Sequence, residues 1–407
     1  MPESAKRAVE EVARACWGKL IAYLAARTHD VSAAEDALSD AFHSALTSWP
    51  TAGIPAKPEA WLLAVARRRL IDGTRRNRTH EDAVERLGAA VDDAAIVGDG
   101  AAFPDDRLKL LFICAHPAID AAARAPLMLQ TVLGLDAGRI ASAFLVAPAA
   151  MSQRLVRAKT KIRDAGVAFE VPAPSQLPER LEAVLDGIYA AYGTGWDDHR
   201  TGTGLSEEAI WLARLLTDLM PAEPEARGLL AMMLFCESRR PARRGADGEY
   251  VPLPEQDVTQ WNRDKITEAE RQLAEAASHG APARYQWEAA IQSVHAQRAI
   301  TGRTEWRIIT ALYDQLLAAT PSTGAAVGRA AAIGYAFGPE AGIAALNEIA
   351  PQTKDYQPAW AVRAHLLEMT GRMDEAQAAY EIATGLSDDP EVRAFLIKRR
   401  GRLSTPQ

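Results

Sequence analysis

The chain is poor in the residues that mark secreted and membrane proteins. Only three of its 407 residues are cysteine (Cys16, Cys114 and Cys236), an odd number with no Cys-x-x-Cys spacing. Such cysteine use is typical of a reducing compartment and argues against disulfides and against a zinc site. No uninterrupted apolar run has the length of a membrane helix, and the charged N-terminus is unlike a signal peptide. We therefore expect a cytoplasmic protein with no membrane contact and no metal.

Runs of β-branched residues, which favour strands, are also missing. Alanine, leucine, arginine and glutamate dominate, and these are good helix formers. The sequence therefore predicts an all-α protein, and its length predicts two or three domains. The histidines are scattered, with no catalytic or metal-binding spacing, so we expect neither enzymatic activity nor a cofactor.

The net charge of −7 is distributed unevenly along the chain. Residues 1–172 hold 22 Lys and Arg against 21 Asp and Glu, a sum of +1, whereas residues 173–407 hold 24 against 32, a sum of −8. A near-neutral first part with local basic clusters, followed by an acidic second part, indicates nucleic-acid contact in the first part only.

The strongest functional pattern lies at residues 136–164, which read as two helices with a break at 145–147 and a proline opening the second helix. The second helix has an apolar stripe, and residues 147–164 hold five basic residues against one acid. An apolar back with a basic front suits a helix in the DNA major groove, although a solvated basic helix on a bundle would look the same. The predicted DNA-reading residues are Ser152, Gln153, Arg154, Arg157 and Lys161.

Three further helices are predicted before this motif, at about 4–27, 33–49 and 58–76, with a Pro/Gly-rich loop at 50–58. Trp61 lies in the first turn of the third helix. Six arginines and one acid follow between residues 67 and 78. An arginine run beside an aromatic ring is a plausible platform for a single nucleic-acid strand. A core tryptophan with a solvated arginine face explains the same pattern equally well.

Two linkers divide the chain. Residues 79–106 carry a net charge of −7 in 28 residues, which is typical of a solvated tether, and residues 167–178 hold three prolines. Near the C-terminus, Gly338 and Gly371 stand 33 residues apart between alanine-rich helices, a spacing typical of tetratricopeptide repeats. The predicted segments are residues 1–79, an acidic linker at 80–106, residues 107–166, a proline-rich linker at 167–178, and a helical extension at 179–400 with repeats at about 323–400.

Several of these motifs resemble the extracytoplasmic-function sigma factors of bacterial RNA polymerase, in the subgroup with a long tetratricopeptide-like C-terminal extension. Residues 9–79 are similar to sigma region 2, and residues 106–166 to region 4. The matching stretches are Ala34-Glu-Asp-Ala-Leu-Ser-Asp-Ala-Phe42, Trp61-Leu-Leu-Ala-Val-Ala-Arg67, Leu70-Ile-Asp72 with Arg75-Arg76, Met151-Ser-Gln-Arg-Leu-Val-Arg-Ala-Lys159, and Glu208-Ala-Ile-Trp-Leu-Ala-Arg214 in the extension.

This resemblance implies a subunit that binds core RNA polymerase, at its clamp and flap regions, and directs initiation at specific promoters. Region 4 would read the −35 element, and the extension would regulate by docking on the sigma modules or binding a partner. The resemblance assigns the polymerase contact to Asp36, Asp40 and Phe42, and the melted −10 strand to Trp61, Arg67, Arg68, Arg75 and Arg76. Two other hypotheses are a helix-turn-helix regulator that works without polymerase and a helical-repeat scaffold.

Overall fold

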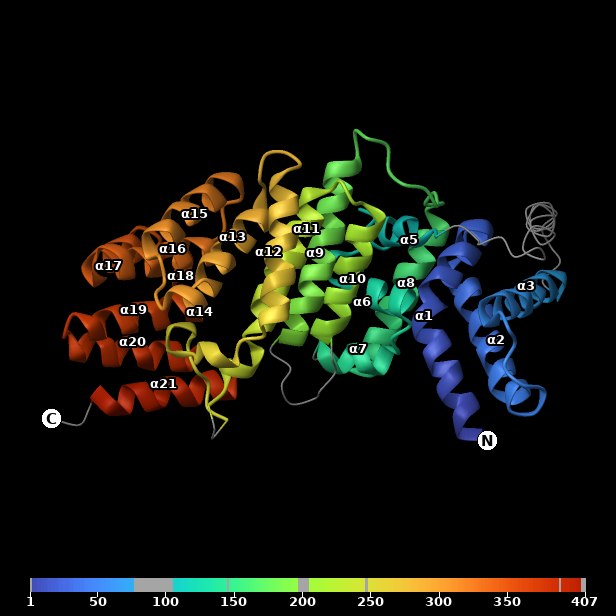
Figure 1. The fold of residues 1–407 in the computed structure, drawn as a ribbon, viewed down its shortest axis with the longest axis horizontal. Coiled ribbons are helices and arrows are strands. Elements are labelled where there is room, and N and C mark those ends of the chain that lie inside the picture. The colour runs from blue at the N-terminus through green and yellow to red at the C-terminus, as the bar shows by residue number, and fades with distance from the viewer. Residues whose placement is uncertain are drawn as a thin grey trace. The chain divides into compact units, whose positions relative to one another are not determined.

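The computed structural model describes residues 2–76, 105–144, 146–196, 205–245, 248–387 and 389–403. Within these ranges the regular elements are all helices, which confirms the predicted all-α fold (Figure 1). A single backbone bridge, between Arg244 and Tyr250, is the nearest approach to a sheet in the described part. No described helix is both long and apolar enough to cross a membrane. The predicted acidic linker lies outside the described residues, apart from its last two.

The chain forms two compact units, Met1–Leu219 and Met220–Gln407. The α-helices of the first unit are α1 (Pro2–Thr28), α2 (Val31–Ala52), α3 (Pro58–Arg76), α5 (Arg107–Cys114), α6 (Ala121–Leu133), α7 (Ala137–Ala143), α8 (Pro148–Asp164), α9 (Leu177–Trp196) and α10 (Leu205–Leu219).

Helices α1, α2 and α3 pack together at one end of this unit (Figure 1). Asp30 caps α2 by accepting a hydrogen bond from the backbone N–H of Ala33 at 3.0 Å. Helix α2 continues through Pro50 to Ala52, three residues into the predicted loop. A proline in the last turn removes one backbone hydrogen bond, and the N–H of Gly53 still bonds Trp49 at 3.0 Å, so the helix ends only there.

Helix α1 also packs against α6, which joins the N-terminal helices to those that follow residue 105. Gly18 is the point of close approach, because a Cβ there would meet the backbone oxygen of Val132 at 2.2 Å. Near it, Gly134 ends α6 at a φ of 71° and lies against the Trp17 ring. Only glycine accommodates both the left-handed backbone and the contact.

The boundary between units differs from the predicted one, which placed everything after residue 178 in the extension. Helix α9 packs on α5 and α6, and α10 packs on α9. The guanidinium of Arg180 donates to the backbone oxygen of Phe112 at 2.7 Å, and Gly187 lies against the end of Met128. The first unit therefore extends to Leu219, because buried contacts hold these two helices to it.

In the second unit the α-helices are α11 (Pro224–Ser238), α12 (Arg263–Ala277), α13 (Arg284–Ala296), α14 (Arg298–Thr301), α15 (Trp306–Ala319), α16 (Thr323–Phe337), α17 (Pro339–Glu348), α18 (Ala350–Thr353), α19 (Gln357–Met369), α20 (Met373–Gly385) and α21 (Pro390–Leu403). Short 3-10 turns lie at Arg240–Arg243, Leu253–Glu255 and Val258–Gln260.

Two hydrophobic clusters lie in this unit, one built around Ile309 and one around Leu366. The two glycines of the predicted repeat occupy comparable turns. Gly338 joins the contacting helices α16 and α17, and Gly371 joins α19 and α20, with φ angles of 107° and 77°. Two helix pairs with glycine turns are thus present, while their assignment as tetratricopeptide repeats stays a prediction.

Candidate nucleic-acid interface

Helix α8 has the two faces that its sequence predicts. Its apolar stripe is buried, with Met151 fully covered and Ala158, the most exposed member, at 6 %. The opposite face is open to solvent and bears all five predicted DNA-reading residues, of which only Arg154 is half-buried. The exposed members are Ser152, Gln153, Arg157 and Lys161.

A short turn brings α8 against α7. The Asp136 carboxylate accepts a hydrogen bond from the backbone N–H of Arg139 at 2.9 Å and so caps the start of α7. After α7, the N–H of Val146 bonds the oxygen of Ala141 at 2.9 Å, and α8 starts at Pro148. The result is a pair of contacting helices with a basic, hydrogen-bonding face on the second. Such a face can reach base edges with Arg and Gln, and phosphates with Lys.

One basic residue of α8 turns away from this face. Lys159 donates a hydrogen bond to the Glu35 carboxylate of α2 at 2.5 Å and one to the Gln130 side chain of α6 at 3.0 Å. The Lys159 and Glu35 side chains are only 10 % and 12 % exposed. Burial raises the pKa of Glu35, and the lysine opposes that shift. The pair fixes α8 against α2 within the first unit.

Helix α2 shows Asp36 and Asp40, two of the three residues assigned to polymerase contact, at its surface. Asp40 also approaches Arg69 at 3.8 Å, an exposed pair of little energetic weight. Phe42 is different, because it is only 8 % exposed and its ring stacks on the Trp17 ring, with 5.9 Å between the ring centres. Phe42 therefore packs between α1 and α2, while its assignment to the polymerase contact stays a prediction.

Helix α3 carries the residues predicted to bind the −10 strand, and the surroundings of the described ones differ. Arg67 points inward, donates a hydrogen bond to Tyr23 Oη and lies 5.1 Å from the centre of that ring. This contact ties α3 to α1, and Arg67 is half-buried, while its assignment to the −10 strand stays a prediction. Trp61 is half-buried with its ring edge-on to Trp49 at 5.6 Å, whereas Arg68 is exposed. The side chains of Arg75 and Arg76 are outside the described ones.

Two apolar side chains near the loop between α2 and α3 were missed by the sequence analysis. Ile54, in the loop, is 49 % exposed, and Leu46, on the last turns of α2, is 44 % exposed. An isoleucine inside a Gly/Pro-rich loop has no strand or helix face to join, and that is the sequence signal that was available. An exposed apolar side chain in or near this loop can contact the face of an unstacked base.

The cysteines of the first unit do not form a reactive site. Burial raises the pKa of Cys16 and of Cys114 to about 12, so both thiols stay protonated at neutral pH. Among the described residues, no group of His, Cys, Asp and Glu side chains is arranged to hold a metal ion.

Comparison with known proteins places a transcription module in the first unit. Residues 13–80, which span most of α1 to α3, match the family model Sigma-70 region 2. Residues 180–277, which begin in α9 and run through α12, match a family of unknown function, DUF6596. No solved structure matches the chain. The N-terminal helices are therefore a sigma-70 region 2 domain, and this supports a sigma-factor role.

The similarity to one relative covers nearly the whole chain. The chain is 38 % identical over 389 residues to a protein of Rhizobium meliloti (strain 1021) named "Uncharacterized protein R00370". The aligned region covers 93 % of this chain and 91 % of the relative. The chain belongs to the same family as this protein.

Proposed function

We propose that the chain is a sigma factor, which binds core RNA polymerase at its clamp and flap regions and directs transcription initiation at specific promoters. The observation that carries the proposal is the sigma-70 region 2 match over residues 13–80. In this proposal the protein acts in the cytoplasm, and its specificity resides in the first unit.

In this proposal, polymerase binding, −10 binding and −35 binding each use a different surface of the first unit. Asp36 and Asp40 on α2 contact the polymerase clamp through charge. The loop before α3, with Ile54, and α3 itself, with Arg68 and the exposed part of Trp61, hold the melted −10 strand by apolar contact, stacking and phosphate pairing. The exposed face of α8 enters the major groove of the −35 element, as recognition helices do.

Run-off transcription tests this proposal directly. The purified chain is added to core polymerase on a template carrying the promoter region upstream of its own gene. Specific transcripts that require both the chain and core polymerase support a sigma factor. DNA binding without polymerase-dependent transcripts favours a stand-alone helix-turn-helix regulator, and absence of salt-sensitive DNA binding favours a scaffold.

The polymerase contact is tested with Asp36→Lys and Asp40→Lys together, measured as co-purification with core enzyme. We expect the double variant to lose binding while its helix content stays unchanged in circular dichroism. The matched control is Glu348→Lys with Asp355→Lys, two exposed acids of the second unit, which makes the same change in net charge. Retained binding by the Asp36/Asp40 variant would remove α2 from the interface.

A further inference from the structure

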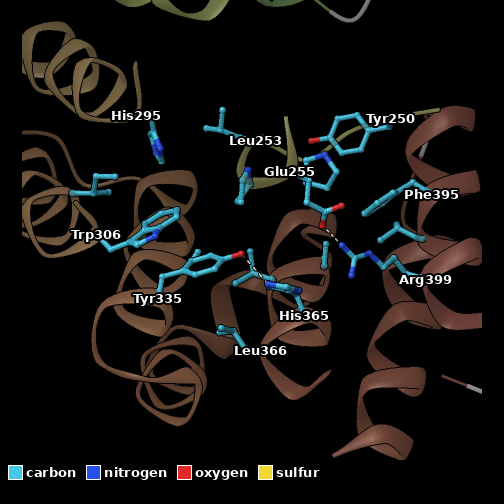
Figure 2. Close-up of a pocket in the computed structure, with 18 of the residues that line it drawn as sticks. Tyr250, Leu253, Glu255, His295, Trp306, Tyr335, His365, Leu366, Phe395 and Arg399 are labelled. Atoms are coloured by element: carbon cyan, nitrogen blue, oxygen red, sulfur yellow. Dashed lines mark hydrogen bonds and ion pairs between the residues drawn. The ribbon is translucent and has the colours of Figure 1, made fainter. Parts of the chain in front are cut away.

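The second unit contains a cavity of about 350 Å³ (Figure 2). It lies between the two hydrophobic clusters, because Ile309 of one and Leu366 and Leu396 of the other line it. The segment at 250–255 completes its wall. A volume of this size lies in the range of sites that bind small molecules.

Aromatic rings form two opposite sides of the cavity. Trp306 and Tyr335 stack nearly parallel, with ring centres 4.3 Å apart and 11° between their planes. Tyr250 and Phe395 meet edge to face at 5.4 Å, and Figure 2 shows these two pairs facing each other across the open space. Flat apolar walls of this kind favour a planar ring, whose faces and edges pack on them.

His295 supplies a polar group in this apolar setting. Its side chain is 9 % exposed, and its ring lies edge to face with Trp306 at 5.4 Å. In the described part of the chain no hydrogen bond to either ring nitrogen is found. Burial first, and then Arg239 and Arg298, lower its pKa to about 3, so the ring is neutral and offers one donor and one acceptor. At the other side, Tyr335 Oη and His365 Nε2 bond each other at 2.8 Å.

Charges around the cavity are compensated. Arg399 pairs with Glu255, the contact drawn in Figure 2, and with Glu368 at 3.5 Å. Arg239 and Arg298, which act on His295 from outside the lining, donate hydrogen bonds to the Gln292 side chain and to the backbone oxygens of Pro254 and Gln256. Glu255 and Arg399, which pair with each other, are thus the charged residues of the lining. A charged ligand would lose its hydration and gain no unpaired counter-ion among the lining residues, so its transfer from water into the cavity would be unfavourable.

From this geometry we propose that the second unit binds a small, planar, uncharged aromatic molecule with one hydrogen-bonding group. The ring lies between the Trp306–Tyr335 and Tyr250–Phe395 pairs, and its polar group bonds a nitrogen of His295. The site concerns the second unit alone and does not depend on polymerase binding by the first.

The test is calorimetric titration of the full chain with three probes that share one ring system: indole, which is uncharged, indole-3-acetate, an anion, and tryptamine, a cation. We expect indole to bind with a Kd below about 1 mM, which is reasonable for so small a ligand. Each charged probe should bind at least about tenfold more weakly, because its charge is left unpaired. Absence of indole binding overturns the proposal, and tighter binding of either ion overturns the choice of an uncharged ligand.

Two variants locate the site. Ala331→Leu, at a lining residue, fills the space and should weaken indole binding about tenfold or more, whereas His295→Phe keeps the ring packing, removes the hydrogen bond and should weaken it severalfold. The matched control is Ala378→Leu, the same enlargement at an exposed position of α20, with wild-type binding expected. Circular dichroism checks that all three variants fold. Unchanged binding in Ala331→Leu, or equal loss in the control, would place indole elsewhere.

Discussion

Single residues on α8 separate two kinds of DNA contact. Arg157 is exposed near the middle of the helix, and Lys161 is exposed one turn later. We expect Arg157→Ala to cost about 1–3 kcal/mol on the −35 element and to relax base preference, because a guanidinium that bonds a base edge carries sequence information. Lys161→Ala should weaken all sequences alike, because a phosphate contact carries none.

The measurement is fluorescence anisotropy with the −35 duplex and a scrambled duplex at two salt concentrations. Lys354→Ala, at an exposed lysine of the second unit, serves as the control for loss of one positive charge. If both α8 variants bind each duplex as the wild type does, the major-groove assignment of α8 is wrong.

A second residue-scale prediction concerns His295. Its pKa in the folded chain, about 3, lies below the 6.5 of an unperturbed histidine, so the unfolded state takes up the proton first. Its contribution to stability is complete above pH 6.5 and is lost as the pH falls, by about 1.4 kcal/mol per pH unit until the folded pKa is reached. His295→Phe should flatten this slope.

Denaturant unfolding between pH 7.5 and 4.5 measures the effect on the second unit. His279→Phe is the matched control, because His279 is exposed, and it should keep the wild-type slope. An identical slope in His295→Phe would show that His295 does not titrate as a buried neutral ring.

At the scale of elements, the contact of α2 with α8 depends on one buried ion pair. Lys159→Met should destabilise the first unit by about 3–5 kcal/mol, because Glu35 then remains buried without its partner. Since burial already raises the pKa of Glu35, protonation relieves the isolated carboxylate, and this loss should shrink as the pH falls toward 4. Urea unfolding at pH 7 and pH 4.5 measures both effects.

The double variant Glu35→Met with Lys159→Met supplies the control, because replacing a buried pair by apolar residues of similar volume is close to neutral. We expect its stability to lie within about 1 kcal/mol of the wild type at both pH values. A Lys159→Met variant as stable as the wild type at pH 7 would mean that the pair does not hold α8 on α2.

At the scale of the whole molecule, we propose that the second unit, which is the larger part of the predicted extension, regulates the sigma module by docking on it or on polymerase. A truncation after Leu219 tests this, because it keeps α9 and α10, which pack in the first unit. We expect the truncated chain to stay folded and its promoter-directed transcription to change severalfold. The separated second unit should bind the first unit or polymerase, more weakly at high salt, since surface charge attraction is screened.

Truncation after Val171 is the informative contrast. It removes α9 from its contacts with α5 and α6, so it should also lower the thermal stability of the first unit. The docking proposal is wrong if truncation after Leu219 leaves transcription unchanged and the separated second unit binds neither the first unit nor polymerase. The second unit would then act through a third partner.

The sequence by itself determined the helices and the polarity of their faces. The buried stripe of α8 and its exposed partners, the exposed acids of α2, and the start of α3 at Pro58 all follow from spacing within one helix. These features depend on neighbours three or four residues away. The region 2 resemblance, confirmed for residues 13–80, comes from local motifs of the same kind.

Only the tertiary structure decided which polar and aromatic residues turn inward. The ring of Phe42 and the guanidinium of Arg67 each contact a residue of another helix, Trp17 and Tyr23 respectively. Lys159 meets Glu35 across 124 positions, and the cavity collects side chains from position 250 to position 399. The spacing of residues within one helix cannot predict such partners. Burial depends on how the helices pack together, and that packing depends on contacts between residues far apart in the chain.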